Sequence, residues 1–361
     1  MNRPTLLLNP GPVTLSERVR NALLREDQCH REPEFAELML DIKARLSRLY
    51  PQAAAEFDAV VMTGSGTCAV EAMIASLAPT KGRTLIVSNG VYGERISAML
   101  EMMGRPAAEV RCDWLSEMDL TAVAMQLSAD PQISHVVAVH NETTTGRLND
   151  IEPLADLCRQ HDAYLMLDAV SSFGAEAIDF SHPNLLAVAA TSNKCLHAIV
   201  GCAFVMVRKR VFEERKSQAN TLYLDLFSYH QAQQEGFSPF TQATHSCFAL
   251  QEALMELDES GGWQARRDRY RTLSGRIRNH LNALGIPCLL AREAYSSMIT
   301  SFGLPEGWRY PDLHDRLCSK GFVIYAGQGA LYHDMFRICN MGDIRDEDLL
   351  RLFDCLTAIL D

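Results

Sequence analysis

Between about residues 58 and 207, short apolar runs alternate with longer amphipathic segments, and this alternation restricts the fold more than any other feature of the sequence. Strands buried on both faces of a parallel sheet read as short apolar runs rich in β-branched residues. The alternation therefore predicts an α/β domain with helices on both faces of the sheet. The predicted strands are 59–63, 84–88, 135–140, 164–168, 186–190 and 203–207, and the predicted helices are 69–77, 92–103, 120–128 and 151–161.

After about residue 212 the pattern changes, which indicates a second domain. A polar stretch at 231–242 is typical of a loop, and long helical patterns follow it. At about 150 residues per domain, a chain of 361 residues has room for two. We predict a large α/β domain over 15–245 and a small α+β domain over 246–361, with 1–14 packing near the small one. The expected later elements are helices 246–257, 262–284, 313–320 and 346–360 and strands 297–302, 321–325 and 335–339.

Charge and composition exclude several classes of protein. With 34 Lys and Arg against 45 Asp and Glu, the net charge is −11, whereas nucleic acids and membrane surfaces require clustered positive charge. The longest apolar stretch, 185–207, has Asn193, Lys194 and His197 in its middle and is a poor membrane span. The 11 cysteines contain no CxxC pair, and no His or Cys spacing suits a metal. We expect a cytoplasmic protein with reduced thiols and no metal.

Lys194 and Asp168 are the first candidates for chemistry. Lys194 follows a predicted buried strand, and ligands of α/β proteins bind beyond the carboxyl ends of such strands. A loop lysine is most often a surface residue, but desolvation at such a site makes the amine nucleophilic. Asp168 ends the preceding predicted strand, where it is either a structural hydrogen-bonding residue or a partner for a cationic ligand nitrogen. Together they are the two groups that a pyridoxal-phosphate enzyme requires.

The segment Gly64-Ser65-Gly66-Thr67 lies between a predicted strand and a predicted helix. Glycines allow the backbone to approach an anion, and the N-terminus of a helix offers unpaired N–H groups. The segment also fits the loose dinucleotide fingerprint, but that site needs an acidic residue at the end of the next strand. Here that strand ends in Ser88-Asn89. The segment therefore favours a phosphate-binding loop.

Three further residues are candidates for the same ligand site beyond the strand ends, although each also has a purely structural interpretation. Thr143 belongs to the run Glu142-Thr143-Thr144-Thr145-Gly146, which is typical of a turn or of a ligand contact at the sheet edge. Tyr92, in a glycine-flanked loop, either stacks on a planar ring or belongs to the core. Arg337 lies inside an apolar strand, so its guanidinium needs a partner, which is a structural carboxylate or an anionic substrate.

Taken together, these motifs resemble the class V, fold type I pyridoxal-phosphate aminotransferases, and among them most of all the subgroup acting on 2-aminoethylphosphonate and pyruvate. The resemblance runs from Leu8-Asn9-Pro10-Gly11-Pro12 to Phe336-Arg337-Ile338 and so covers nearly the whole chain. It implies a large domain with a mostly parallel sheet of the seven-stranded type and a small α+β domain. It also implies a homodimer with shared active sites.

The resemblance assigns a role to each matching residue. Lys194 is expected to form an imine with pyridoxal 5'-phosphate, and Asp168 is expected to pair with its pyridine nitrogen. Arg337 is expected to bind the substrate carboxylate. The remaining expected cofactor contacts are Ser65, Gly66, Thr67 and Asn193 at the phosphate, Tyr92 stacked on the ring, Thr143 at the ring hydroxyl, Val170 under the ring, and Thr241 reaching the phosphate across the dimer interface.

The expected reaction moves the amino group of 2-aminoethylphosphonate to pyruvate, giving phosphonoacetaldehyde and L-alanine, as in phosphonate degradation. Two departures from the sequences of the resembled subgroup affect the expectation for the amino donor. The segment at Thr241 continues Gln242-Ala243 where relatives have Ser-Pro, and Tyr325 is followed by Ala-Gly-Gln in place of Pro-Gly-Lys, which removes a positive charge. The alternatives are an alanine or serine–glyoxylate aminotransferase, a lyase or desulfurase, for which Cys339 in a strand is a poor nucleophile, and a non-enzymatic binding protein.

Overall fold

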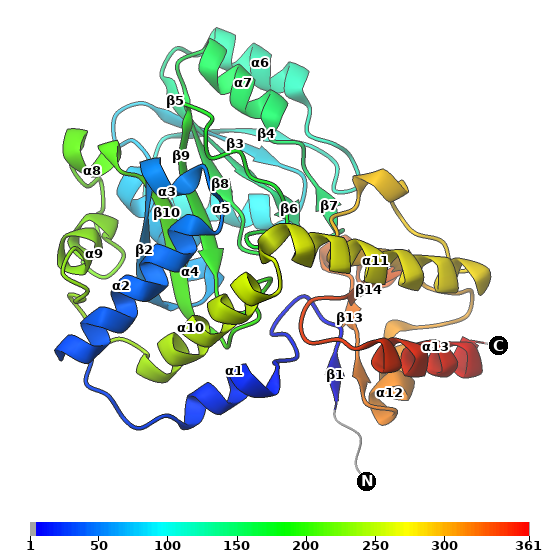
Figure 1. The fold of residues 1–361 in the computed structure, drawn as a ribbon. Helices are drawn as coiled ribbons and strands as arrows, with labels where there is room; N and C mark the ends of the chain where they lie inside the picture. Colours follow the sequence, from blue (N-terminus) through cyan, green and yellow to red (C-terminus); the bar gives the residue numbers. More distant parts are fainter. Residues whose placement is uncertain (1–4, 361) are drawn as a thin grey trace.

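The computed structural model describes residues 5–360, which form a large α/β unit and a smaller unit beside it (Figure 1). At the centre of the large unit is a seven-stranded sheet of spatial order β2-β10-β9-β8-β5-β3-β4. Every neighbouring pair is parallel except those that β10 makes with β2 and β9. The predicted, mostly parallel sheet is confirmed. Its strands are β2 Phe57–Gly64, β3 Arg83–Ser88, β4 Ala107–Arg111, β5 Ile133–Val139, β8 Tyr164–Asp168, β9 Leu185–Thr191 and β10 Gly201–Arg208.

Both faces of this sheet are buried, as the short apolar runs predict. Along β2, Val61 faces one apolar core while Val60 and Met62 face the other, because successive side chains of a strand point to opposite faces. Helices cover each face. One core takes side chains from α2 Pro33–Arg48, α6 Leu120–Ala129, α7 Glu152–Gln160 and α10 Thr244–Glu259, and the other from α4 Gly66–Leu77, α5 Val91–Met102 and α9 Leu226–Gln233.

The sequence pattern missed the edge strand β4 and the helix α2. In β4 only Val110 is buried, so its five residues carry no apolar run. Helix α2 begins at Pro33, a residue suited to the first turn of a helix, and buries one face against the sheet. The shorter elements of the large unit are α1 Glu17–Asn21, η1 Ala22–Leu24, α3 Ala53–Glu56, β6 Asn141–Glu142, β7 Arg147–Leu148 and α8 Arg210–Glu214.

The smaller unit is built on a three-stranded antiparallel sheet of order β11-β14-β13. The single strand expected at 321–325 is in fact two short strands on different sheets. Phe322–Val323 (β12) pairs in parallel with Leu6–Leu7 (β1), while Tyr325–Ala326 (β13) pairs with β14. The remaining elements are α11 Gly262–Ala283, η2 Arg292–Ala294, β11 Ile299–Gly303, α12 Tyr310–Ser319, η3 Gly329–Leu331, β14 Met335–Cys339 and α13 Asp346–Leu360.

The N-terminal segment and α10 bear on the predicted domain join. Strand β1 pairs with β12 of the smaller unit, and residues 1–4 of the segment 1–14 lie outside the described part. The join expected near residue 245 falls at the start of α10. Because Phe248, Leu250 and Leu254 of α10 pack into the core of the large sheet, the change of packing lies closer to Ser260, between α10 and α11. No helix among residues 5–360 is long and apolar enough to cross a membrane.

Candidate active site

The site lies at the carboxyl ends of the parallel strands, where β8 and β9 are neighbours. Asp168 is the last residue of β8, and Lys194 lies in the turn that follows β9. Adjacent parallel strands end at the same edge of the sheet, so the topology brings these residues together. Consistent with this, the charge of Asp168 acts on the pKa of Lys194, and the charge of Lys194 acts on that of Asp168.

Lys194 is held against the N-terminal segment. Its Nζ donates a hydrogen bond to the carbonyl oxygen of Pro10. Gly11 has a φ of +113°, and a Cβ there would lie 2.7 Å from the Cδ of Lys194, so this position accepts only glycine. Burial lowers the pKa of Lys194 below its ordinary value, because desolvation disfavours the ammonium ion. The site therefore favours a neutral, nucleophilic amine.

Asp168 is buried, with 5% of its surface exposed. Its Oδ1 accepts a hydrogen bond from the N–H of Val170 at 2.9 Å. Burial raises its pKa to about 6, against the opposing effects of that hydrogen bond and of Arg95 and Lys194. A carboxylate so poorly solvated gains more from a buried cationic partner than a surface carboxylate does.

The first turn of α4 has the features of a phosphate site. Ser65 is the N-cap residue of this twelve-residue helix, and its hydroxyl makes no capping bond. The early N–H groups of a helix have no intrahelical acceptor, and the positive end of the helix dipole lies beside them. Gly66 packs so closely under Val170 that a Cβ would lie 2.5 Å from Cγ1. Gly66, Thr67, Tyr92, Asp168 and Val170 line one small pocket, and their contacts to a cofactor stay a prediction.

Arg95 also lines this pocket, although no sequence motif singled it out. Its guanidinium carbon lies 4.7 Å from the centre of the Tyr92 ring, and Nη1 is 3.5 Å from Oγ1 of Thr67. Arg95 lies one helical turn after Tyr92, so both side chains are on the same face of α5. The sequence signal for Arg95 is its i, i+3 spacing from Tyr92, after the glycine-flanked loop.

Thr143 and Arg337 meet across the boundary of the two units. Thr143 is buried, and its hydroxyl donates to Oγ of Ser171 at 3.0 Å. The carbonyl oxygen of Thr143 accepts a hydrogen bond of 2.6 Å from Nη1 of Arg337. Arg337 is fully buried on β14, and burial lowers its pKa from the ordinary value. Asn193, a predicted contact of the cofactor phosphate, accepts at Oδ1 from the Thr191 hydroxyl at 2.9 Å.

Glu142 begins the run at 142–146, but that motif assigned no role to its carboxyl group. Its Oε1 accepts from the N–H of Thr144 at 3.0 Å and from the Thr144 hydroxyl at 2.6 Å, while Oε2 has no partner in the described chain. A Cβ on Gly90 would lie 2.7 Å from Oε1, so the carboxyl group packs against the start of α5. Burial raises its pKa to about 7.

Thr241 is not among the residues that line the small pocket of Asp168 and Val170. Its side chain is exposed, and it is the neighbouring Ala243 whose N–H bonds to the hydroxyl of Thr63 at the end of β2. Its predicted role across a dimer interface stays a prediction. No cluster of His, Cys, Asp or Glu suited to a metal ion occurs among the described residues.

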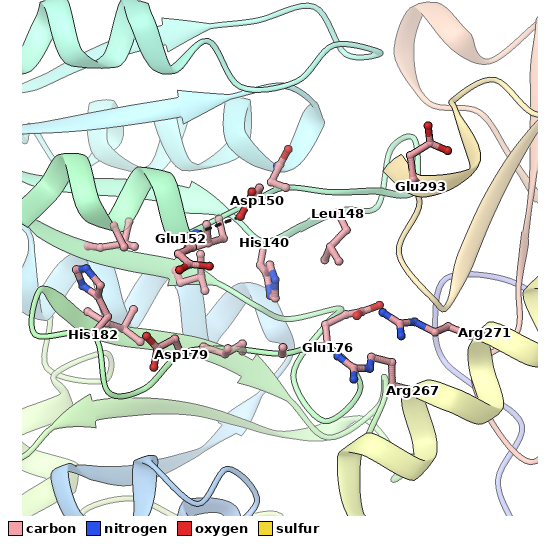
Figure 2. Close-up of a pocket in the computed structure, with 18 residues that line it drawn as sticks. His140, Leu148, Asp150, Glu152, Glu176, Asp179, His182, Arg267, Arg271 and Glu293 are labelled. Carbon is pink, nitrogen blue, oxygen red and sulfur yellow. Dashed lines mark hydrogen bonds between the residues drawn. The ribbon is translucent and has the colours of Figure 1, made fainter.

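A larger cavity, of about 450 Å³, lies elsewhere, lined by residues of α7, β8 and α11 (Figure 2). Figure 2 shows the carboxyl group of Glu176 beside the guanidinium groups of Arg267 and Arg271. Acidic side chains outnumber these two arginines in the lining, so the cavity does not suit an anion. None of the predicted site residues is among the described residues that line it.

Comparison with known proteins places this site in a family. The family model for class V aminotransferases matches residues 16–341, so the chain belongs to that family. A curated relative, the 2-aminoethylphosphonate–pyruvate transaminase of Klebsiella pneumoniae subsp. pneumoniae, is 36% identical over 97% of this chain and 96% of its own length. The crystal structure of an aspartate aminotransferase from Thermus thermophilus, 26% identical, superimposes with a TM-score of 0.89 over 98% of this chain and 99% of that chain.

Class V aminotransferases work with pyridoxal phosphate, and the residues of this chain fit that group. The uncapped start of α4 suits the binding of its phosphate. The aromatic ring of Tyr92 and the side chain of Val170 suit packing against its planar ring. The buried Asp168 suits an ion pair with a protonated ring nitrogen. The poorly solvated amine of Lys194 matches its aldehyde.

Proposed function

We propose that this chain catalyses the transfer of the amino group of 2-aminoethylphosphonate to pyruvate, giving phosphonoacetaldehyde and L-alanine. The observation that carries the proposal is the meeting of a half-buried lysine, a buried carboxylate and a fully buried arginine, Lys194, Asp168 and Arg337. The relatives that match over nearly their full length and bear the name of this transaminase support it.

When bound, pyridoxal phosphate supplies an electron-withdrawing ring that weakens the C–H bond next to the amine. Its phosphate would be held by Ser65, Gly66 and Thr67, and its ring by Tyr92, Val170, Thr143 and Asp168. Asp168 would keep a proton on the ring nitrogen, because its buried carboxylate is stabilised by a cation beside it.

Lys194 would carry the proton in each half of the reaction. Burial lowers the pKa of its Nζ, which favours the neutral amine, so Nζ would accept the proton from the substrate carbon and return it to a second carbon, on the cofactor. The bond from Nζ to the Pro10 carbonyl holds the amine at the crevice while it is free. Arg337 would bind the phosphonate of the donor and the carboxylate of pyruvate in turn, which fixes each substrate with its reacting carbon near Lys194.

The half-reaction tests this assignment. Purified holoenzyme is expected to be yellow, and 2-aminoethylphosphonate without a keto acid is expected to bleach the visible absorbance. L-alanine is expected to do the same through the reverse half-reaction. A protein bleached by L-alanine or L-serine, returned to the yellow form by glyoxylate and unaffected by the phosphonate would be a glyoxylate-type aminotransferase instead.

We further propose that the enzyme works in the cytoplasm as a homodimer, with Thr241 of each subunit contacting the cofactor phosphate of the other. The exposure of Thr241 in the single chain and the exposed apolar side chains of Leu222 and Tyr223 support an interface on this side. Sedimentation equilibrium is expected to give twice the chain mass of 40.2 kDa. A monomer with full activity would overturn the shared-site proposal.

A further inference from the structure

The guanidinium of Arg337 is already occupied by the protein itself. Nε and Nη2 donate to the carbonyl oxygen of Ala326 at 2.9 and 2.6 Å. Nη1 donates to the carbonyl oxygen of Thr143 at 2.6 Å and to Oε1 of Gln328 at 3.2 Å. A guanidinium has five N–H groups, so within the described chain a single N–H, on Nη2, has no protein acceptor.

A carboxylate or phosphonate binds an arginine best through two parallel hydrogen bonds. For Arg337 the second bond requires Nη1 to release one of its two acceptors. The Thr143 carbonyl belongs to buried backbone next to the site and is held at the shorter distance. Gln328 is a partly exposed side chain on the loop between β13 and η3, and its contact is the longer one. Gln328 is therefore the partner that gives way.

We propose that Gln328 is a specificity-determining residue, whose amide oxygen holds the place of the substrate's anionic group on Arg337 and is displaced when that group binds. The inference rests on the proposed function only in that the substrate anion binds Arg337. An amide oxygen is a neutral acceptor and therefore a weaker partner for a guanidinium than a carboxylate or a phosphonate. The buried cation thus keeps an acceptor in the empty site without forming a tight ion pair.

The position of Gln328 also marks where an incoming anion reaches Arg337. The Tyr325 ring lies 5.1 Å from the guanidinium carbon of Arg337, and the backbone carbonyls of Ala326 and Thr143 take the other directions. An incoming anion is thus directed to the sector that Gln328 occupies. Substitutions of Gln328 are expected to change the affinity for substrate anions and to leave the proton transfer at Lys194 unchanged.

Two variants with opposite expected effects test this on the holoenzyme. The readout is the rate at which L-alanine bleaches the visible absorbance. Its dependence on L-alanine gives two quantities, the L-alanine concentration at half-maximal rate and the limiting rate. Gln328→Ala removes the competing acceptor and is expected to lower that concentration about threefold, while Gln328→Glu places a carboxylate on Arg337 and is expected to raise it at least about tenfold. The limiting rate is expected to stay within about twofold in both.

Gln264→Glu, on the exposed face of α11, is the matched control for the added charge, and it is expected to behave as the unaltered protein. Inhibition of the same half-reaction by propionate and by methylphosphonate is expected to follow the same order among the variants. Equal weakening by both substitutions, or no change in either, would overturn the inference. Because L-alanine is the probe, a failure of 2-aminoethylphosphonate to react would contradict the proposed donor and leave this result standing.

Discussion

At the scale of single residues, the site depends on ionisable groups that have been taken out of water. Burial lowers the pKa of Lys194 and Arg337 and raises the pKa of Asp168 and Glu142. All four shifts have one cause, since a poorly solvated site disfavours the charged form of every group. Such groups are ready to bind partners of opposite charge, which is what a cofactor and a small anionic substrate provide.

Asp168→Asn tests the role of the carboxylate charge. The amide oxygen can still accept the N–H of Val170, so the local fold and the melting temperature are expected to change little. Without the negative charge a ring nitrogen loses its proton, and we expect turnover to fall by about 100-fold or more. The measurement is the limiting rate of the L-alanine half-reaction. A rate within a few-fold of the unaltered protein would contradict the assigned role.

Glu142→Gln tests the buried carboxyl at the start of α5. Its pKa in the folded, cofactor-free protein is about 7, above the ordinary 4.5. The unfolded chain therefore ionises first, and the free energy of unfolding falls as the pH rises from 4.5 to about 7. At about 1.4 kcal/mol per pKa unit, Glu142 contributes on the order of 3 kcal/mol to this fall.

Urea unfolding of the cofactor-free protein between pH 5 and pH 8 measures that contribution. The Glu142→Gln variant is expected to show a flatter dependence of stability on pH, whereas Glu94→Gln, at a residue of α5, is expected to keep the slope of the unaltered protein. Identical slopes in Glu142→Gln and the unaltered protein would show that the carboxyl of Glu142 titrates outside this range.

At the scale of elements, the start of α4 is the part on which cofactor binding depends most. Gly66→Ala is expected to weaken the binding of pyridoxal phosphate at least about tenfold, because the new Cβ meets Cγ1 of Val170 at 2.5 Å. Gly275→Ala, inside α11 with its nearest neighbour at 3.4 Å, is the control and is expected to leave binding unchanged. Equilibrium titration of the cofactor-free protein, followed by absorbance, distinguishes the two.

The elements also show what the sequence predicts well. Strand β8 and helix α13 begin and end at the residues that the apolar periodicity predicts. Asp168 therefore lies at a strand end, as expected. Strand β4 was missed because an exposed edge strand carries too few apolar residues. Arg95 and Glu142 were missed for another reason. Their roles depend on which face of α5 meets which loop, and only the tertiary packing decides that.

At the scale of the whole molecule, His197 joins the loop of Lys194 to the smaller unit. It adopts a left-handed backbone, with a φ of 63°, and its Nε2 accepts the N–H of Gly342 at 2.9 Å. The same nitrogen contacts the hydroxyl of Tyr270 on α11. Burial keeps the pKa of His197 well below its ordinary value, so the ring stays a neutral acceptor.

His197→Asn keeps a residue that tolerates this backbone and removes the link. We expect the free energy of unfolding to fall by about 1–3 kcal/mol, because the Gly342 N–H is left without its acceptor. Asp162→Asn is the control, at a residue outside the site with a φ of 53°. Denaturant unfolding measures both, and equal stability of the two variants would show that the link does not stabilise the molecule.

Above all, we propose that this molecule moves an amino group from a phosphonate to a keto acid. The most direct measurement follows the nitrogen itself. Holoenzyme is incubated with ¹⁵N-labelled 2-aminoethylphosphonate and unlabelled pyruvate, with the Lys194→Ala variant as control. We predict ¹⁵N-alanine and phosphonoacetaldehyde in equal amounts, and neither product with the variant. Absence of label from alanine, or equal labelling by the Lys194→Ala protein, would contradict the proposal.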